Sequence, residues 1–333
     1  MATSEPYILA TVPIDPIAHE ELGELHPIVT ALKDDRETLL GLVRGAMGLI
    51  SRGTASIDGE MMDAGPGLRF ISRSGAGYEN VDVEAATERG IPVVNAPLLG
   101  DAVAEATFAM ILALTKRLEY WHESLVAGEW DRRITERTAE LNEKTLGIIG
   151  LGRIGREVAA RAKAFKMRLV AHDPYVDEAV VGELDVEMMS VEALLAEADV
   201  ISLHAVSTPE TDGMINRSNL KLVKRGAYLV NLARGAMIED LDILHEALED
   251  GRLAGVGLDV FPEEPPLNLD HPLFGHPGFL GSPHVLASTE ETEARCYRSM
   301  CKDVAAVLRG ERPEWCVNPE VFDSPNLRKP EEA

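Results

Sequence analysis

Three glycines follow directly on an apolar run in the stretch KTLGIIGLGRIG, residues 144–155. Glycine loses more backbone freedom on folding than other residues, so glycines at a strand end or helix start lower stability unless the backbone needs them there. Gly150, Gly152 and Gly155 have the spacing G-x-G-x-x-G. This spacing indicates a turn whose backbone another group approaches closely, although a glycine-rich turn without a ligand has the same letters. The surrounding sequence has to separate the two interpretations.

The segments around this turn favour a dinucleotide site. LGIIG is typical of a buried strand, REVAARAKAF of a helix, and the next strand, RLVAHD, ends at Asp173, 18 residues after Gly155. In a dinucleotide-binding βαβ unit the pyrophosphate lies at the helix N-terminus, and an acidic residue about 20 residues further on binds the adenosine ribose. Arg153 and Ile154 are then expected to offer backbone N–H groups to the pyrophosphate. Because the carboxylate of Asp173 repels a 2′-phosphate, NAD is favoured and NADP is less favoured.

Short apolar runs alternate with helical stretches along the chain, which predicts an α/β fold of two doubly wound parallel-sheet domains. Strands of the first series are expected at 7–12, 47–51, 68–72 and 91–95, and those of the second at 146–150, 168–173, 199–205, 227–233, 254–260 and 278–284. Residues 101–127 are predicted to form one long hinge helix between the domains, with Asp101 as its N-cap. A C-terminal helix over about 288–309 is predicted to return to the first domain. The predicted domains are therefore 1–100 with 289–333, for substrate, and 101–288, for NAD.

Composition argues against several classes of partner. Acidic residues outnumber basic ones 56 to 32, a formal net charge of −24, whereas nucleic-acid binders and proteins of anionic membrane surfaces need a basic face. No apolar stretch is long enough to span a membrane. Cys296, Cys301 and Cys316 lack metal-ligand spacing, so no metal site is predicted. The N-terminus does not resemble a signal peptide, and we expect a cytoplasmic protein with reduced cysteines.

Arg234, Glu264 and His284 each follow a predicted strand of the second domain, at the edge where open α/β sheets bind their ligands. Each also has a purely structural interpretation, as an arginine in a surface turn, a solvated carboxylate in the loop PEEPP, and a loop histidine. Together they suit hydride transfer to a 2-keto acid. The arginine would bind the substrate carboxylate, and the glutamate would raise the pKa of the histidine so that its protonated form can protonate the alkoxide.

Several long motifs, in order, resemble the D-isomer-specific 2-hydroxyacid dehydrogenase family over roughly residues 45–320. They are SGAGYENVDVEAATERGIPVVNAP, VAEATFAMILALTKR, LGIIGLGRIGREVAARAKAF, ADVISLHAVSTPET, NLARG, GVGLDVFPEEP and SPHVLAST. The resemblance implies a flavodoxin-like substrate domain, a Rossmann NAD-binding domain and a homodimer built through the long-helix region. It also implies an NAD-dependent oxidoreductase acting on a small D-2-hydroxy acid or 2-keto acid, of glyoxylate, hydroxypyruvate or 3-phosphoglycerate type.

The resemblance further implies roles for individual positions. Arg234, Glu264 and His284 match the family's catalytic residues, of which the arginine and the histidine also contact substrate. Asp259 matches the aspartate that contacts the nicotinamide carboxamide, and further cofactor-binding positions are Thr208, Leu232 and Ala233. The substrate-binding positions of the first domain are Ala76 and Gly77, whose loop offers N–H groups to the substrate carboxylate, and Arg52, which matches a substrate contact of phosphoglycerate dehydrogenases.

Departures from the family pattern leave the substrate open. Val206 stands where proline is common, and Gly100 stands in a loop that is about one residue shorter than in many relatives and lacks their asparagine. Glu264 argues against formate, because relatives that use formate have glutamine there. An alternative is a non-catalytic NAD(H)-sensing corepressor of the same fold, since such relatives can keep the arginine, glutamate and histidine. Turnover with 2-keto acids, set against NADH-dependent binding to a partner protein, distinguishes the two.

Overall fold

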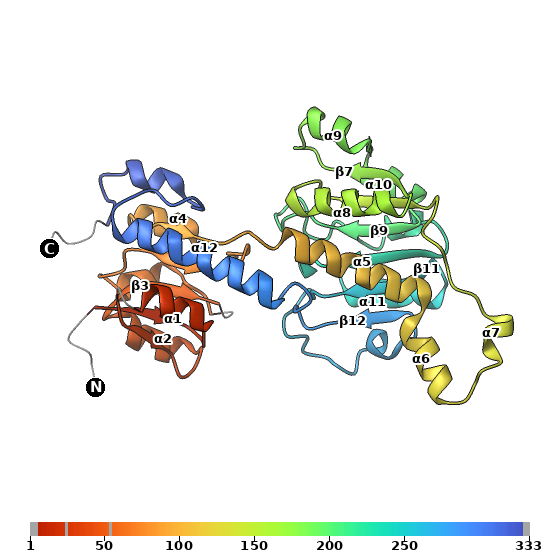
Figure 1. The fold of residues 1–333 in the computed structure, drawn as a ribbon, viewed down its shortest axis with the longest axis horizontal. Coiled ribbons are helices and arrows are strands. Elements are labelled where there is room, and N and C mark those ends of the chain that lie inside the picture. The colour runs from red at the N-terminus through yellow and green to blue at the C-terminus, as the bar shows by residue number, and fades with distance from the viewer. Residues whose placement is uncertain (1–5, 24–25, 53–54, 329–333) are drawn as a thin grey trace. The chain divides into compact units, whose positions relative to one another are not determined.

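The computed structural model describes residues 6–23, 26–52 and 55–328. The N-terminal segment, which does not resemble a signal peptide, is described only from residue 6 onward. The chain divides into two compact units, Met1–Leu99 with Ser288–Ala333, and Gly100–Ala287. In Figure 1 the first unit combines the red and orange N-terminal part with the blue helix α12 (Glu290–Leu308). The chain therefore leaves the first unit and returns to it.

The first unit holds five parallel strands in the order β2-β1-β3-β4-β5, the flavodoxin-like order. The strands are β1 (Tyr7–Ala10), β2 (Ile28–Thr30), β3 (Ala46–Ser51), β4 (Ile71–Arg73) and β5 (Val93–Val94). The three-residue strand β2 is too short for an apolar run, and the sequence pattern missed it. The helices are α1 (Pro16–Leu22), α2 (Arg36–Val43), α3 (Gly59–Ala64), α4 (Val83–Glu88) and α12, whose predicted position is confirmed.

The second unit holds seven parallel strands in the order β12-β11-β10-β9-β6-β7-β8. They are β6 (Thr145–Ile149), β7 (Arg168–His172), β8 (Glu187–Met188), β9 (Val200–Leu203), β10 (Ala227–Asn231), β11 (Leu253–Leu258) and β12 (Phe279–Gly281). The strand order reverses between β6 and β9, as in a Rossmann fold, and ligands of such sheets bind outside the carboxyl ends at this point. The predicted fold class of two doubly wound parallel sheets is confirmed. The two-residue strand β8 was missed.

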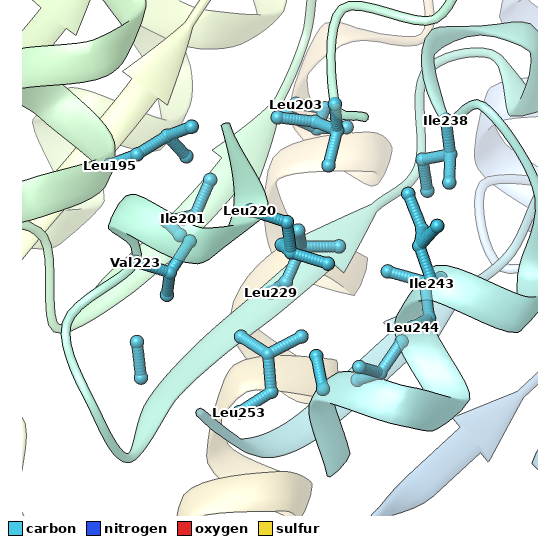
Figure 2. Packing of buried hydrophobic residues seen from close by; sticks show 14 of the residues in the cluster. Leu195, Ile201, Leu203, Leu220, Val223, Leu229, Ile238, Ile243, Leu244 and Leu253 are labelled. Atoms are coloured by element: carbon cyan, nitrogen blue, oxygen red, sulfur yellow. The ribbon is translucent and has the colours of Figure 1, made fainter. Parts of the chain in front are cut away.

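Helices cover both faces of the seven-stranded sheet. They include α8 (Arg153–Ala164), α9 (Glu178–Leu184), α10 (Val191–Glu197) and α11 (Leu241–Glu249). Figure 2 shows Leu195, Ile201, Leu229 and Leu244 among the apolar side chains that pack together with the sheet, each fully buried. Burying one such side chain contributes about 1.5–3 kcal/mol. This packing holds the carboxyl ends of β9, β10 and β11 next to one another.

The prediction of one helix over 101–127 is wrong. The structure has α5 (Gly100–Lys116) and α6 (Leu118–Val126), separated by Arg117, whose φ of 51° lies in the left-handed region. The guanidinium of Arg117 lies over the ring of Tyr120 at 3.8 Å and is bonded to the carboxylate of Glu136 at 2.7 Å. Because Glu136 belongs to a segment beyond 127, the helical periodicity of 101–127 contains no sign of this contact.

The predicted N-cap is also corrected. Asp101 lies inside the first turn of α5, and its Oδ1 accepts a hydrogen bond from Arg161 of α8 at 2.9 Å. Figure 1 shows α5 and α8 side by side on the second unit, so Asp101 ties two helices together and does not start one. Beyond α6 lies the short helix α7 (Arg132–Thr135). Over the described ranges, no helix has both the length and the apolar content needed to cross a membrane.

Candidate active site

The glycine turn lies between β6 and α8, and its glycines meet different demands. Gly150 has φ 93°, and a Cβ there would come within 2.4 Å of the backbone N of Ala205. A Cβ on Gly155 would come within 2.1 Å of the carbonyl O of Gly150, so α8 packs directly on the turn. Gly152 is the N-cap of α8, and a Cβ on it would meet nothing within 4 Å. The turn is thus closed on its protein side and open at the helix N-terminus, as a pyrophosphate site requires.

Asp173 follows β7 and lies against this turn. Its Oδ2 accepts a hydrogen bond from the backbone N–H of Leu151 at 2.7 Å, and its Oδ1 accepts one from Tyr175 at 2.9 Å. Arg153 and Ile154 begin α8, immediately after the open Gly152. The structure therefore brings together the three glycines, the N-terminus of α8 and the carboxylate of Asp173, which the sequence predicted to form one dinucleotide-binding βαβ unit. These groups fit a dinucleotide.

The other predicted cofactor positions lie at the ends of β9, β10 and β11. Thr208 belongs to a turn after β9, where its N–H donates to Oγ1 of Thr211 at 2.8 Å. Leu232 and Ala233 are buried directly after β10. Asp259 directly follows β11 and is buried. All of them belong to the edge of the sheet that carries the glycine turn.

Glu264 and His284 form a hydrogen-bonded pair. Oε2 of Glu264 lies 2.8 Å from Nδ1 of His284, and Oε1 of Glu264 accepts a hydrogen bond from the N–H of Phe261 at 3.0 Å. The hydrogen bond with Glu264 raises the pKa of His284, against the opposing effect of burial. Burial acts to raise the pKa of Glu264, but its hydrogen bonds with His284 and Phe261 hold that pKa below its usual range. The His284 side chain is 53% exposed and accessible to a substrate.

Arg234 lies beside this pair and acts on it. Its positive charge lowers the pKa values of both Glu264 and His284, although it is not the largest influence on either. The buried Asn231 holds the arginine's turn, because its side chain donates to the carbonyl of Arg234 at 2.9 Å and accepts from the N–H of Ala233 at 3.0 Å. A Cβ on Gly235 would come within 1.9 Å of the carbonyl of Phe261, so the turn directly contacts the start of the Glu264 loop.

Asp259 positions the segment that carries His284. Its Oδ1 accepts hydrogen bonds from Oγ of Ser282 at 2.6 Å and from the N–H of Val285 at 3.0 Å. His284 itself has φ 51°, a conformation that a non-glycine residue adopts only where its surroundings hold it. The nicotinamide contact that the resemblance implies for Asp259 is therefore accompanied by a structural role that the sequence pattern did not show.

A second histidine at this edge has the opposite character. His204 follows β9 and is buried, and its Nε2 lies 2.7 Å from Oγ of Ser202. Burial lowers its pKa to about 3, so this side chain stays neutral at ordinary pH. Of the two histidines, only His284 has an environment that favours the protonated form.

The predicted residues of the first unit lie after β3 and β4. The carbonyl of Gly77 accepts a hydrogen bond from Nε of Arg73 at 3.0 Å, and the carbonyl of Ala76 accepts one from the side chain of Asn95 at 2.9 Å. These two hydrogen bonds tie the loop to the rest of the first unit. Arg52 directly follows β3, and its guanidinium forms an ion pair with Glu293 of α12 at 2.8 Å.

Sequence reasoning missed Asn231, Arg73 and Glu293. Asn231 lies within the family string NLARG and Arg73 directly precedes the string SGAGY, so the motifs pointed to these segments but not to these side chains. Glu293 lies 241 residues from its partner Arg52 along the chain. No local pattern could connect those two residues.

Comparison with known proteins identifies the family. Residues 108–285 match the family model described as D-isomer specific 2-hydroxyacid dehydrogenase, NAD binding domain. The chain is 40% identical over 313 residues to the D-3-phosphoglycerate dehydrogenase of Methanocaldococcus jannaschii, covering 93% of this chain but 59% of that protein. It is 38% identical to the glyoxylate reductase of Aeropyrum pernix, covering 95% of this chain and 97% of that protein.

A solved structure extends the likeness to three dimensions. The D-lactate dehydrogenase of Aquifex aeolicus, complexed with NAD and lactic acid, aligns with a TM-score of 0.83 at 30% identity, covering 92% of this chain and 96% of the other. This chain spans only 59% of the length of the phosphoglycerate dehydrogenase, but it spans 97% of the length of the glyoxylate reductase. On the family match and these relatives, the chain belongs to the D-isomer specific 2-hydroxyacid dehydrogenase family, with an NAD-binding domain over residues 108–285.

Proposed function

We propose that this protein transfers a hydride between NAD(H) and a small D-2-hydroxy acid or the matching 2-keto acid, of glyoxylate, hydroxypyruvate or 3-phosphoglycerate type. The hydrogen bond between Glu264 and His284, with Arg234 beside it in an NAD-binding domain, carries the proposal. The relative from Aeropyrum pernix, which this chain covers almost completely, is a glyoxylate reductase, and this supports the same class of reaction.

The proposed proton donor is His284. Its Nδ1 is bound to Glu264, so Nε2 is the ring nitrogen left to protonate the alkoxide that forms when the carbonyl is reduced. Arg234 binds the substrate carboxylate and polarises the carbonyl. The backbone N–H groups of Ala76 and Gly77 are proposed as further carboxylate donors. When bound, the nicotinamide supplies the hydride.

Cofactor binding is assigned to the glycine turn and Asp173, with Thr208, Leu232, Ala233 and Asp259 along the same edge. The carboxylate of Asp173 accepts from Leu151 and Tyr175, and its remaining lone pairs can accept from a ribose hydroxyl. A negative charge there opposes a 2′-phosphate, which favours NAD over NADP.

We further propose a homodimer in the cytoplasm. In Figure 1 α6 and α7 extend away from the sheet of the second unit, and their segment exposes large apolar side chains. These are Leu118, Leu125, Val126, Trp130 and Ile134. Such a patch on a monomer is typical of a protein interface. The three cysteines are free thiols, which suits a reducing compartment.

The first prediction tests the activity. With NADH and a panel of 2-keto acids, the wild type should oxidise NADH, and His284→Asn should lose turnover by roughly 10²–10⁴-fold because the proton donor is gone. NADH affinity, followed by its fluorescence, should be nearly unchanged. Turnover of the variant at the wild-type rate would contradict the assigned role. Tight NADH binding by a wild type that reduces no keto acid would favour the corepressor alternative.

The second prediction concerns pH. Reduction needs protonated His284, whose pKa is raised by Glu264 above its ordinary value of about 6.5. kcat/KM for reduction should therefore be highest at low pH within the stable range and fall as pH rises through that raised pKa. Glu264→Gln removes the charge that raises it, so the fall should occur at lower pH. Identical midpoints for wild type and variant would show that the pair does not control the donor.

The third prediction concerns the cofactor. Asp173→Asn keeps an acceptor for the N–H of Leu151 but removes the negative charge. NADH binding should weaken and NADPH binding should improve, so the ratio of their dissociation constants should change about tenfold or more. Fluorescence titration with both nucleotides measures it. A constant ratio would mean that this carboxylate does not select the ribose.

The fourth prediction concerns assembly. Light scattering should give twice the mass of one chain, and Val126→Asp, at a position 74% exposed on α6, should shift the protein toward monomer. Leu267→Asp is a matched control, because Leu267 is as exposed but lies on a different loop of the second unit. Dissociation by the control alone would place the interface elsewhere.

A further inference from the structure

Two arginines lie at the carboxyl edge of the five-stranded sheet. Arg73 ends β4 and Arg52 directly follows β3, and these strands are parallel neighbours. Besides binding the carbonyl of Gly77, Arg73 donates to the carbonyl of Ser51 at 3.1 Å. The loop with Ala76 and Gly77 is thereby tied to the strand end next to Arg52. Ligands of open α/β sheets bind at this edge, and Arg52 is the residue that follows the strand end to which the loop is tied.

Helix α12 holds this guanidinium in place. One nitrogen of Arg52 donates to Oε1 of Glu293 at 2.8 Å, and another donates to the hydroxyl of Tyr297 at 3.4 Å. Tyr297 is fully buried, and Glu293 lies one helical turn before it on the same face. The Glu293 side chain is 23% exposed and that of Arg52 40%, so both remain close enough to solvent to meet a ligand.

The pair changes what this position can bind. An arginine without a partner would offer a phosphate a bidentate, charge-assisted contact. Here a carboxylate already accepts from the guanidinium, and it repels any second anion that arrives. A phosphate would compete with the carboxylate of Glu293 for the guanidinium and would bring up to about two negative charges near it. A hydrogen or a hydroxyl group on the substrate meets no such repulsion.

We infer that Glu293 is a specificity-determining residue, which neutralises Arg52 and restricts the substrate to 2-keto acids without a phosphate. The inference rests on the proposed function and chooses among the substrate types left open there. It separates this chain from the phosphoglycerate-type assignment that its D-3-phosphoglycerate dehydrogenase relatives would suggest.

The test compares hydroxypyruvate with 3-phosphohydroxypyruvate as substrates for NADH oxidation. The wild type should prefer hydroxypyruvate in kcat/KM. Glu293→Gln should raise the ratio of kcat/KM for the phosphorylated over the unphosphorylated acid about tenfold, because the repelling charge is removed. The double variant Arg52→Gln, Glu293→Gln should lose that gain, since the released arginine is its source.

A matched control removes the same charge nearby. Glu291 is exposed on the first turn of α12, and Glu291→Gln should leave the ratio nearly constant. A wild-type preference for 3-phosphohydroxypyruvate would overturn the inference, as would an unchanged ratio in Glu293→Gln with hydroxypyruvate still reduced. If the wild type reduces neither acid, the proposed function fails instead. In that case the selectivity is tested by calorimetry, which measures the binding of 3-phosphoglycerate and of glycerate to the wild type and to Glu293→Gln. The variant should gain affinity for 3-phosphoglycerate but not for glycerate.

Discussion

Parallel strands that follow one another through helices all end at the same edge of their sheet, and the candidate site depends on this constraint. In the second unit the residues after β6, β7, β10, β11 and β12 carry the glycine turn, Asp173, Arg234, Asp259 and His284. The parallel arrangement brings segments more than a hundred residues apart along the chain to one edge, so no separate contact is needed to bring each pair of segments together. The apolar core of the sheet supplies the stability, and the loops beyond it carry the polar groups.

Hydrogen bonds hold the polar side chains at this edge of the second unit in defined positions. The carboxylate of Glu264 accepts from both Phe261 and His284, and Asp259 accepts from the segment on either side of His284. The imidazole is thus held at a left-handed backbone position with one nitrogen engaged. An orienting carboxylate, a second carboxylate under the loop and a neighbouring arginine set both the position and the protonation of one exposed side chain. His204, near the same edge but buried beside the hydroxyl of Ser202, has the opposite protonation preference.

In the first unit, the proposed selectivity depends on an ion pair at the carboxyl edge of the five-stranded sheet. Arg73 ends β4 opposite Ser51, and Arg52 lies one residue beyond that register position, so the two arginines have different surroundings. Arg73 binds carbonyl oxygens and serves the loop, whereas Arg52 is paired with a carboxylate from α12. The return of the C-terminal helix to the first unit therefore does more than complete a core with Tyr297 and Met300. It brings the negative charge of Glu293 to the carboxyl edge of the sheet.

The sequence by itself determined the alternation of strands and helices, the two parallel sheets, the glycine turn with its carboxylate, and the positions of Arg234, Glu264 and His284. These follow from short apolar runs and from residues fixed at a given spacing, which are local features. It did not determine the break at Arg117, where contacts with Glu136 outweigh helical periodicity, or the short strands β2 and β8, whose two or three residues carry no pattern. Nor did it show Asn231 holding the arginine's turn, Asp259 supporting His284, or Glu293 opposite Arg52. Only the tertiary structure decided these, because each depends on a hydrogen bond or ion pair whose geometry exists after the strands have packed.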